Sequence, residues 1–166
     1  LIRRGDAVRS FSRGSYPELD RLGVEHVQGD LADLDDICAA VKGCDVVFHV
    51  AAKAGPWGPY REYYQANVEG TRNVIAACKK TGVRRLVHCS SIHAFADQPG
   101  DRTVDESRPL ALGPHHMPYD RSKAAGQSIV LEAVRERGLD AVVINPTAVV
   151  GPHDYKISRM GEVLLD

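Results

Sequence analysis

The chain has 166 residues, of which 43% are hydrophobic and 26% charged, a composition typical of one compact globular domain. Lysine and arginine number 21 against 22 aspartate and glutamate, and no block of one sign occurs, so the charge pattern favours neither nucleic acid nor a membrane surface as a partner. The longest apolar runs have the length of a strand, too short to span a bilayer. We therefore expect a cytoplasmic protein that binds neither nucleic acid nor membranes.

Cysteines and histidines give no sign of a metal centre or a disulfide framework. The four cysteines stand 6, 34 and 11 residues apart without a CxxC pair, so buried free thiols are expected. Two of the seven histidines, His115 and His116, are adjacent in a predicted loop, where a metal ion would need further ligands at a matching spacing. We therefore expect no metal site.

The first third of the chain alternates short strands with short helices. The pattern predicts strands at 7–11 and 24–27. It predicts helices at 17–22 and 34–42. Pro17 suits the first position of a helix, and Asp33 is the kind of residue that caps one. The order is therefore strand, helix, strand, helix.

The middle of the chain continues this alternation with longer elements. The apolar run at 45–52 is typical of a parallel strand covered by helices on both faces. A long helix follows the loop at 55–59, which is rich in glycine and proline, and ends at Gly82. Its expected buried face carries Tyr64, Val68, Thr71, Ile75 and Cys78. A strand at 86–89 follows.

The last third holds an irregular segment, a helix and a strand. Residues 92–118 contain four prolines and few periodic apolar residues, as is typical of a functional loop. A helix over roughly 119–137 and a strand at 141–144 follow. This rhythm predicts an α/β fold, a doubly wound parallel sheet with helices on both faces. Ligands of such sheets bind beyond the carboxyl ends of the strands.

A tyrosine and a lysine four positions apart open the last helix. Tyr119 and Lys123 share one helical face, and a neighbouring cation lowers the pKa of a phenol, which is otherwise too weak an acid for proton transfer at neutral pH. Ser90 and Ser91 end the preceding strand, where a hydroxyl can bind a substrate oxygen while the tyrosine transfers the proton and a nicotinamide the hydride. A half-buried aromatic beside a surface lysine is the plainer interpretation.

Three other segments match sequence motifs that occur together in one known protein family. Gly29-Asp30-Leu31 follows the second strand, the run at 49–52 (His-Val-Ala-Ala) follows the third, and the run at 67–71 (Asn-Val-Glu-Gly-Thr) lies in the long helix. Together with the serine, tyrosine and lysine, they make the whole chain resemble the extended short-chain dehydrogenase/reductase family, or NAD-dependent epimerase/dehydratase superfamily. The resemblance implies a Rossmann-like sheet, with 1–150 as a partial NAD(P)-binding domain and 151–166 as the start of a C-terminal substrate-binding region.

The resemblance also implies roles for individual residues. Tyr119 is expected to be the acid–base group, Lys123 to tune it and hold the cofactor ribose, and Ser91 to orient the substrate oxygen. The residues expected to bind the cofactor are Ser12, Arg13, Asp30, Leu31, Ala51, Ala52, Lys53, Asn67, Tyr119, Lys123, Pro146 and Thr147. Plainer interpretations stay open: an Asx-type turn at Asp30, close packing at the two alanines, and a helix-packing amide at Asn67 as against one that orders water near the lysine.

The residues after the first strand bear on the choice of cofactor. Ser12 and Arg13 stand where relatives that prefer NAD carry an acidic residue. Arg13 offers several donors to a 2′-phosphate, so NADP(H) is favoured, with NAD(H) as the alternative; a solvated turn arginine is the plainer interpretation. The expected partner is a small-molecule substrate, and a homodimer is one assembly left open.

Two segments resemble one branch of the family. The run at 50–58 and Ser-Ser-Ile at 90–92 are similar to 3β-hydroxysteroid dehydrogenases and dihydroflavonol reductases. Related dehydratases often carry an acidic residue directly after the active-site serine, whereas Ile92 and His93 follow Ser91 here. This favours hydride transfer between the cofactor and a secondary alcohol or ketone. A nucleotide-sugar epimerase or dehydratase, and a non-catalytic dinucleotide sensor, are the alternatives.

The family's glycine-rich turn, between a first strand and a first helix, does not occur in the sequence, which opens at Leu1. We therefore expect a chain that lacks its first strand and main phosphate site, and that also stops before most of the substrate-binding part. Residues 1–166 alone are expected to aggregate or fold partly and to bind NADP(H) weakly, because strands at 7–11 and 45–52 would expose unpaired backbone groups.

Overall fold

The computed structural model describes residues 1–166 except 56, 98–99, 101–102, 137, 152–160 and 163–166. The predicted second region at 151–166 lies largely outside the described residues. The strands of the described part are β1 (Arg9–Ser12), β2 (Glu25–Gln28), β3 (Val46–His49), β4 (Arg85–Cys89) and β5 (Ala141–Ile144). Its helical segments are η1 (Ile2–Arg4), α1 (Pro17–Arg21), α2 (Leu34–Val41), α3 (Tyr60–Tyr64), η2 (Gln65–Glu69), α4 (Gly70–Thr81), η3 (Ile92–Ala94) and α5 (Pro118–Arg135).

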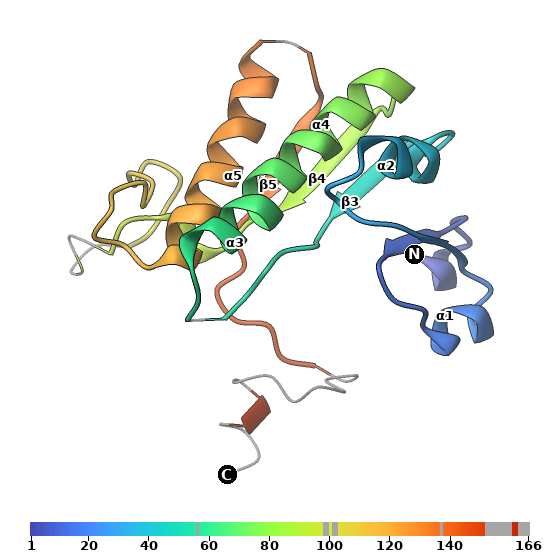
Figure 1. Ribbon diagram of the computed structural model, residues 1–166, viewed down its shortest axis with the longest axis horizontal. Helices are drawn as coiled ribbons and strands as arrows, with labels where there is room; N and C mark the ends of the chain where they lie inside the picture. Colours follow the sequence, from blue (N-terminus) through green and yellow to red (C-terminus); the bar gives the residue numbers. More distant parts are fainter. Residues whose placement is uncertain (56, 98–99, 101–102, 137, 152–160, 163–166) are drawn as a thin grey trace.

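The strands form two parallel groups. β1 pairs with β2, and β4 pairs with β3 on one side and β5 on the other. Among the described residues no hydrogen-bonded ladder joins β1 to β3. Figure 1 shows α1 and α2 on opposite sides of the β1–β2 pair, with α2 packed against α4. Parallel strands joined through helices make this the Rossmann-like α/β fold that the sequence predicts.

Two helix starts follow directly from local chemistry. Pro17 occupies the first turn of α1, where its missing N–H is not needed. The Asp33 carboxylate accepts hydrogen bonds from the main-chain N–H groups of Asp35 at 2.8 Å and Asp36 at 3.1 Å, which satisfies donors that the first turn of α2 leaves free. Both predicted starts are confirmed.

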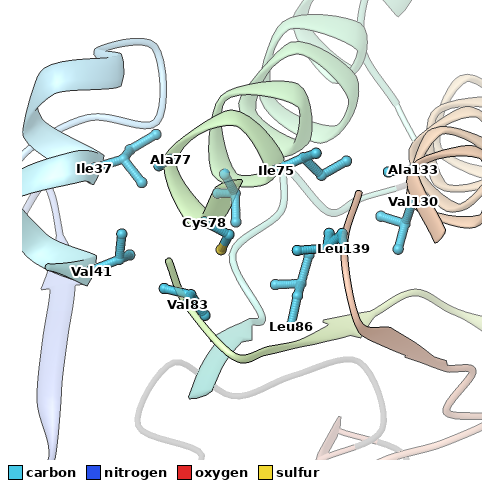
Figure 2. Packing of buried hydrophobic residues seen from close by; sticks show 11 residues of the cluster. Ile37, Val41, Ile75, Ala77, Cys78, Val83, Leu86, Val130, Ala133 and Leu139 are labelled. Atoms are coloured by element: carbon cyan, nitrogen blue, oxygen red, sulfur yellow. The ribbon is translucent and has the colours of Figure 1, made fainter. Parts of the chain in front are cut away.

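The main core lies between helices α2, α4 and α5 and one face of the β3–β4–β5 sheet (Figure 2). Its buried members are Ile37, Val41, Val74, Ile75, Ala77, Cys78, Val83, Leu86, Val130, Ala133 and Leu139. Removing one large apolar side chain from water contributes about 1.5–3 kcal/mol. This cluster therefore fixes α4 and α5 against the sheet, and α5 carries the candidate tyrosine and lysine.

The other face of this sheet is uncovered by the described residues. Phe48 of β3 is 52% exposed, Val50 just beyond it 64%, and Ile144 of β5 45%. The apolar run at 45–52 predicts cover on both faces, and here the structure differs, because α4 and α5 both pack on the side of Val47. Apolar composition reports what a strand can bury and says nothing of which segment covers it.

The long helix predicted before Gly82 is present but carries one π turn. α3, η2 and α4 run without a break, and η2 has π geometry. A π turn inserts an extra residue, so the buried face upstream of it moves by one position. Tyr63 is therefore completely buried, whereas the sequence periodicity places Tyr64 on that face.

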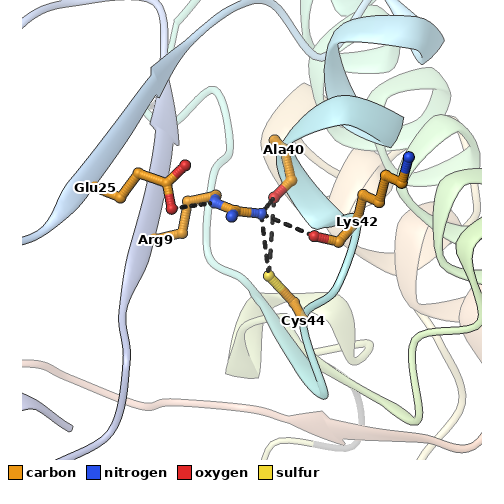
Figure 3. Close-up of polar contacts among 5 residues, drawn as sticks. All are labelled: Arg9, Glu25, Ala40, Lys42 and Cys44. Atoms are coloured by element: carbon orange, nitrogen blue, oxygen red, sulfur yellow. Dashed lines mark hydrogen bonds and ion pairs between the residues drawn. The ribbon is translucent and has the colours of Figure 1, made fainter.

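Arg9 fastens the β1–β2 pair to α2 (Figure 3). Its Nε lies 2.8 Å from Glu25 Oε2 on β2. Its Nη1 donates to the main-chain oxygens of Ala40 and Lys42, each at 2.9 Å, and contacts the Cys44 sulfur at 3.8 Å. The guanidinium thus satisfies carbonyl groups that the end of α2 leaves unpaired, and it links the two strand groups through α2.

Candidate active site

Ser91 and Tyr119 meet where β4 ends and α5 begins. Ser91 has an extended backbone and lies at the start of η3, where its Oγ accepts a hydrogen bond from the His93 N–H at 3.2 Å. Its side chain lies close enough to the Tyr119 phenol to lower the pKa of that phenol. The neighbouring Ser90 is buried, and its hydroxyl has no partner among the described residues. The structure therefore pairs Ser91, and not Ser90, with the tyrosine.

The end of β5 holds Ser91 in place from the other side. Asn145 Nδ2 donates to the Ser91 main-chain oxygen at 2.8 Å and to Gln127 Oε1 of α5 at 2.7 Å. The Ile92 N–H donates to the Pro146 oxygen at 3.0 Å. Hydrogen bonds of this kind join the ends of β4 and β5 to α5. The serine therefore stands on a cross-linked edge and not on a free loop.

Tyr119 is half-buried between two other rings. The Tyr63 and His93 rings lie edge-on to it, with centroids 6.5 and 6.0 Å away. Burial raises the pKa of the Tyr119 phenol, the Ser91 side chain opposes this, and the nearby Asp120 carboxylate adds to it. The phenol is consequently protonated at neutral pH in this arrangement.

Lys123 is directed toward the end of β4. Its side chain is buried, and Nζ donates to the Cys89 main-chain oxygen at 2.8 Å. Burial lowers the pKa of this ammonium. Burial is the largest influence on the Tyr119 phenol and raises its pKa, while the Lys123 cation is engaged by the Cys89 carbonyl; the effect of Lys123 on the phenol stays a prediction.

Asn67 joins three segments around the tyrosine. It lies in the π turn η2 and is buried. Its Oδ1 accepts from the Lys53 N–H at 2.7 Å, and its Nδ2 donates to the Lys53 main-chain oxygen at 2.9 Å and to Ser122 Oγ at 2.8 Å. Both amide hydrogens are thus used by the protein, which matches the helix-packing interpretation of Asn67 better than the ordering of water.

The loop after β3 is held beside the same site. Tyr63 Oη donates to the main-chain oxygens of Gly55 at 2.8 Å and Trp57 at 2.9 Å. Lys53 Nζ forms an ion pair with Glu62 at 3.0 Å and lies 5.3 Å from the centre of the Tyr63 ring. Tyr63 therefore links this loop to the Tyr119 ring, while the Trp57 side chain remains 84% exposed.

The residues predicted to recognise the nucleotide part form a separate group at the ends of β1 and β2. Arg13 Nη1 lies 4.0 Å from Asp30 Oδ2, and both side chains are largely exposed. Asp30 Oδ1 accepts from the Ala32 N–H at 2.9 Å, so the plainer Asx-type turn is present. Ser12 Oγ donates to the Gly14 oxygen at 3.1 Å. The Leu31 oxygen accepts from Asn73 Nδ2 at 2.8 Å.

The remaining predicted cofactor residues follow β3 and β5. Ala51 and Ala52 are exposed after β3, and their small side chains leave the main chain accessible. Pro146 is partly buried by its contact with η3, and Thr147 is exposed. No group of three or more histidine, cysteine or acidic side chains in the described part of the chain could hold a metal ion, and all four cysteines are free thiols. None of the described helices has the length and apolar character needed to cross a membrane.

Ser122 is a residue of the site that the sequence interpretation does not include, whereas His93 is one that the sequence offers as a residue facing the substrate. Ser122 is completely buried, and its Oγ donates to the Tyr119 main-chain oxygen at 2.7 Å. His93 Nδ1 lies 3.4 Å from Asp120 Oδ1. The position of Ser122, three residues after the tyrosine, places it on the face of Tyr119. Its contact with Asn67, 55 positions away, has no sequence signal.

Comparisons with known proteins extend this description. The pattern of the NAD dependent epimerase/dehydratase family matches residues 1–165. The chain is 42% identical over 165 residues to a 2-alkyl-3-oxoalkanoate reductase of Stenotrophomonas maltophilia (strain K279a), covering 98% of this chain and 49% of that protein. It is 35% identical over 168 residues to a putative dihydroflavonol 4-reductase of Synechocystis sp. (strain ATCC 27184 / PCC 6803 / Kazusa), covering 99% of this chain and 48% of that protein.

Solved structures of similar proteins superpose on this chain along most of its length. The crystal structure of gox2253 superposes with a TM-score of 0.85 at 34% identity, covering 99% of this chain and 51% of that chain. A UDP-glucose 4-epimerase of Thermus thermophilus in complex with NAD gives a TM-score of 0.84 at 26% identity, covering 99% of this chain and 55% of that chain. The chain thus spans about half the length of the relatives it matches. By this match along nearly its whole length, the chain belongs to the NAD dependent epimerase/dehydratase family.

Proposed function

We propose that the protein is an oxidoreductase that transfers a hydride between a nicotinamide cofactor and a secondary alcohol or ketone, with Ser91, Tyr119 and Lys123 at its active site. The approach of the Ser91 hydroxyl to the Tyr119 phenol, whose pKa it lowers, carries this proposal. It places two hydroxyl groups together at the carboxyl end of β4, the edge where ligands bind in such sheets. Named reductases among the relatives support the same class of reaction.

Each of the three side chains has a task that its surroundings support. Tyr119, whose phenol is protonated at neutral pH, gives a proton to the carbonyl oxygen of a ketone during reduction and takes it back during oxidation. Ser91 donates a hydrogen bond to the same oxygen and orients it. Lys123 has three N–H donors, of which Cys89 engages one, and the others are suited to cofactor hydroxyls and to lowering the cost of a phenolate.

The residues at the sheet edge fit a dinucleotide. The exposed Arg13, Asp30, Ala51 and Ala52 follow three strands at one edge and leave their main chain or charged groups accessible. When bound, the nicotinamide supplies or accepts the hydride. Arg13 favours NADP(H), because its ion pair with Asp30 is long and exposed and therefore weak, so the guanidinium can turn to a 2′-phosphate. NAD(H), named with a solved relative, is the alternative.

The relatives also suggest the class of substrate. Two of them are named 2-alkyl-3-oxoalkanoate reductases, and others are named 3-beta-hydroxysteroid dehydrogenases. We therefore infer an apolar ketone or secondary alcohol as the substrate. Ile92, which follows Ser91, offers no acid or base for elimination, and this sets the proposal apart from a dehydratase.

Substitution of Tyr119 by phenylalanine tests the proposal. Tyr119→Phe removes one hydroxyl and is expected to abolish ketone reduction while NADPH binding, followed by fluorescence, stays within about twofold of the parent. Tyr64→Phe is the matched control, since the Tyr64 ring lies tilted against the Tyr60 ring, with centroids 5.9 Å apart, and has no part in the site. Near-normal kcat in Tyr119→Phe would contradict the assignment.

A further inference from the structure

A main-chain carbonyl oxygen in the π turn contacts residues from two other parts of the fold. Asn67 lies in η2, where the regular helical ladder is interrupted. Its carbonyl oxygen accepts a hydrogen bond from Thr71 Oγ1 at 2.8 Å. Thr71 is completely buried, and His49 Nε2 of β3 lies 2.9 Å from the same hydroxyl oxygen. Because the single Thr71 proton goes to Asn67, His49 must donate through Nε2.

His49 is suited to that fixed donor role. Burial, with a smaller contribution from Lys123, lowers the pKa of His49 to about 4, so the ring is neutral at physiological pH and keeps its one proton on the nitrogen that faces Thr71. The order of donors from β3 through Thr71 to Asn67 therefore does not change across the neutral range.

Helix α5 approaches the same carbonyl from the other side. A Cβ atom at Gly126 would lie 2.6 Å from the Asn67 oxygen and 3.8 Å from Thr71 Oγ1. A contact of 2.6 Å with a main-chain oxygen is too short for any side chain, and the backbone cannot turn away as a flexible side chain can. The glycine is therefore what lets α5 pack this closely against η2.

This contact is linked to the reacting groups by short steps. The Asn67 side chain donates to Ser122, and Ser122 donates to the Tyr119 main-chain oxygen. The same amide holds Lys53 at the start of the loop after β3. The place of the Asn67 carbonyl thus sets both the start of α5, with Tyr119, and the loop beside it.

We propose that Thr71 and Gly126 are positioning residues for the active site: together they hold the Asn67 main-chain carbonyl at one place and thereby fix Tyr119 relative to Ser91 and the loop that starts at Lys53. The proposal rests on the proposed function for its catalytic consequence. Its structural part, the placement of Tyr119, can be measured without substrate or cofactor.

Thr71→Val tests the hydroxyl, and Thr81→Val is a matched control. Thr81 lies in the same helix and makes the same kind of bond, Oγ1 to the Ala77 oxygen at 2.8 Å, away from the site. Thr71→Val is expected to lower kcat about tenfold with little change in KM, as a small misplacement of a reacting group does. It is also expected to bring the Tyr119 pKa, followed by NMR of labelled tyrosine, down toward its ordinary value, because looser packing admits water.

The control and rescue variants separate positioning from stability. Thr81→Val is expected to lower the Tm by a similar amount and to leave kcat and the Tyr119 pKa unchanged. Thr71→Ser keeps the hydroxyl and should retain both. An unchanged Tyr119 pKa in Thr71→Val, or an equal change in Thr81→Val, overturns the proposal. If the parent protein reduces no ketone, the proposed function fails, while the pKa comparison still decides the positioning role.

Gly126→Ala tests the same carbonyl from α5 and does not depend on Thr71. Alanine is the better helix former, so a gain in Tm with unchanged kcat and Tyr119 pKa would contradict the proposal. The expected result is a lower kcat and a Tyr119 pKa shifted as in Thr71→Val. Gly138→Ala just beyond α5 is the control, because the added methyl group meets the flexible end of the Lys79 side chain, with Nζ at 2.7 Å, which can give way.

Discussion

The two strand groups of this protein hold their site residues in different ways. Around β3–β4–β5, the residues near Tyr119 are buried and joined by hydrogen bonds of 2.7–2.9 Å, as at Asn67 and Ser122. At the ends of β1 and β2, Arg13 and Asp30 are exposed and 4.0 Å apart. The first group suits proton transfer, which needs fixed geometry. The second suits recognition of a charged group by side chains that move to meet it.

The largest effect on this contrast is expected from Asn67→Leu. The substitution leaves Ser122 and the main-chain groups of Lys53 without their partners, so the free energy of unfolding should fall by about 3 kcal/mol. Asn73→Leu in the same helix loses a bond to the Leu31 oxygen at 2.8 Å and a longer, exposed one to the Ala32 oxygen at 3.4 Å, and should cost about 1 kcal/mol. Urea unfolding of both variants measures the difference. Equal losses in the free energy of unfolding would show that the buried hydrogen bonds of Asn67 stabilise the fold no more than the bonds of Asn73 do.

Acid is expected to have the next largest effect: it should lower the stability of the buried residues around β3–β4–β5. Burial lowers the pKa of His49 to about 4 and of His88 to about 3, while both have pKa values of ~6.5 in the unfolded chain. The unfolded state therefore takes up protons first, and stability falls as the pH drops from about 6.5 toward 4 and 3, and is unaffected by these groups above pH 7.

His88→Leu isolates this effect. Neither ring nitrogen of His88 has a partner among the described residues, and the ring is buried against His49, with centroids 5.2 Å apart. The variant should be at least as stable as the parent at pH 7. Between pH 7 and 4.5, its free energy of unfolding should fall by roughly half as much as that of the parent. Exposed His115→Leu is the control. An unchanged pH slope in His88→Leu would exclude His88 as its source.

A smaller effect is expected where Arg9 joins the two groups. Arg9→Met keeps the aliphatic stem and removes the contacts with Glu25, Ala40 and Lys42. Amide hydrogens of β1 and β2 should then exchange faster, while those of β4 keep the rate of the parent. Arg85→Met is the control, because its ion pair with Asp140 joins neighbouring strands of one sheet on the surface. Equal acceleration in β4 would mean that the two groups open together.

The smallest change is expected at the exposed end of β1. Arg13→Ala should lower kcat/KM for NADPH about tenfold, the loss expected for one charge-assisted hydrogen bond, and leave kcat/KM for NADH unchanged. No change in stability is expected, since the Arg13 side chain is 83% exposed. A parent enzyme that prefers NADH, with a preference unaffected by Arg13→Ala, would refute the predicted role.

Local signals explain what the sequence predicts well. Proline at the first turn of α1, the Asp33 cap and the apolar period each depend on neighbours within a few residues, and the alternation of strands and helices follows from them. The π turn is not predicted in this way, since no residue type between Gln65 and Glu69 indicates π geometry. The shift of the buried face from Tyr64 to Tyr63 follows from that turn alone.

The side-chain partners that the sequence does not predict are contacts between residues far apart in the chain. The motif brings Tyr119 and Lys123 onto one helical face, but Lys123 bonds to Cys89, 34 positions away, a partner that the spacing does not indicate. Arg9 in β1 reaches the end of α2 over 31 or more positions. Spacing along one helix predicts which residues face the same way, and the partner that each one meets depends on how the elements pack.

Transfer of deuterium tests hydride transfer with Tyr119 as its proton donor most directly. The protein is incubated with NADPH deuterated at the hydride position and an apolar 3-oxo acid or cyclic ketone, and the alcohol is analysed by mass spectrometry and NMR. Deuterium is expected on the new carbinol carbon with the parent and with the Tyr64→Phe control. With Tyr119→Phe, no deuterated alcohol is expected. No transfer to any ketone by the parent, or undiminished transfer by Tyr119→Phe, would contradict the proposed reaction.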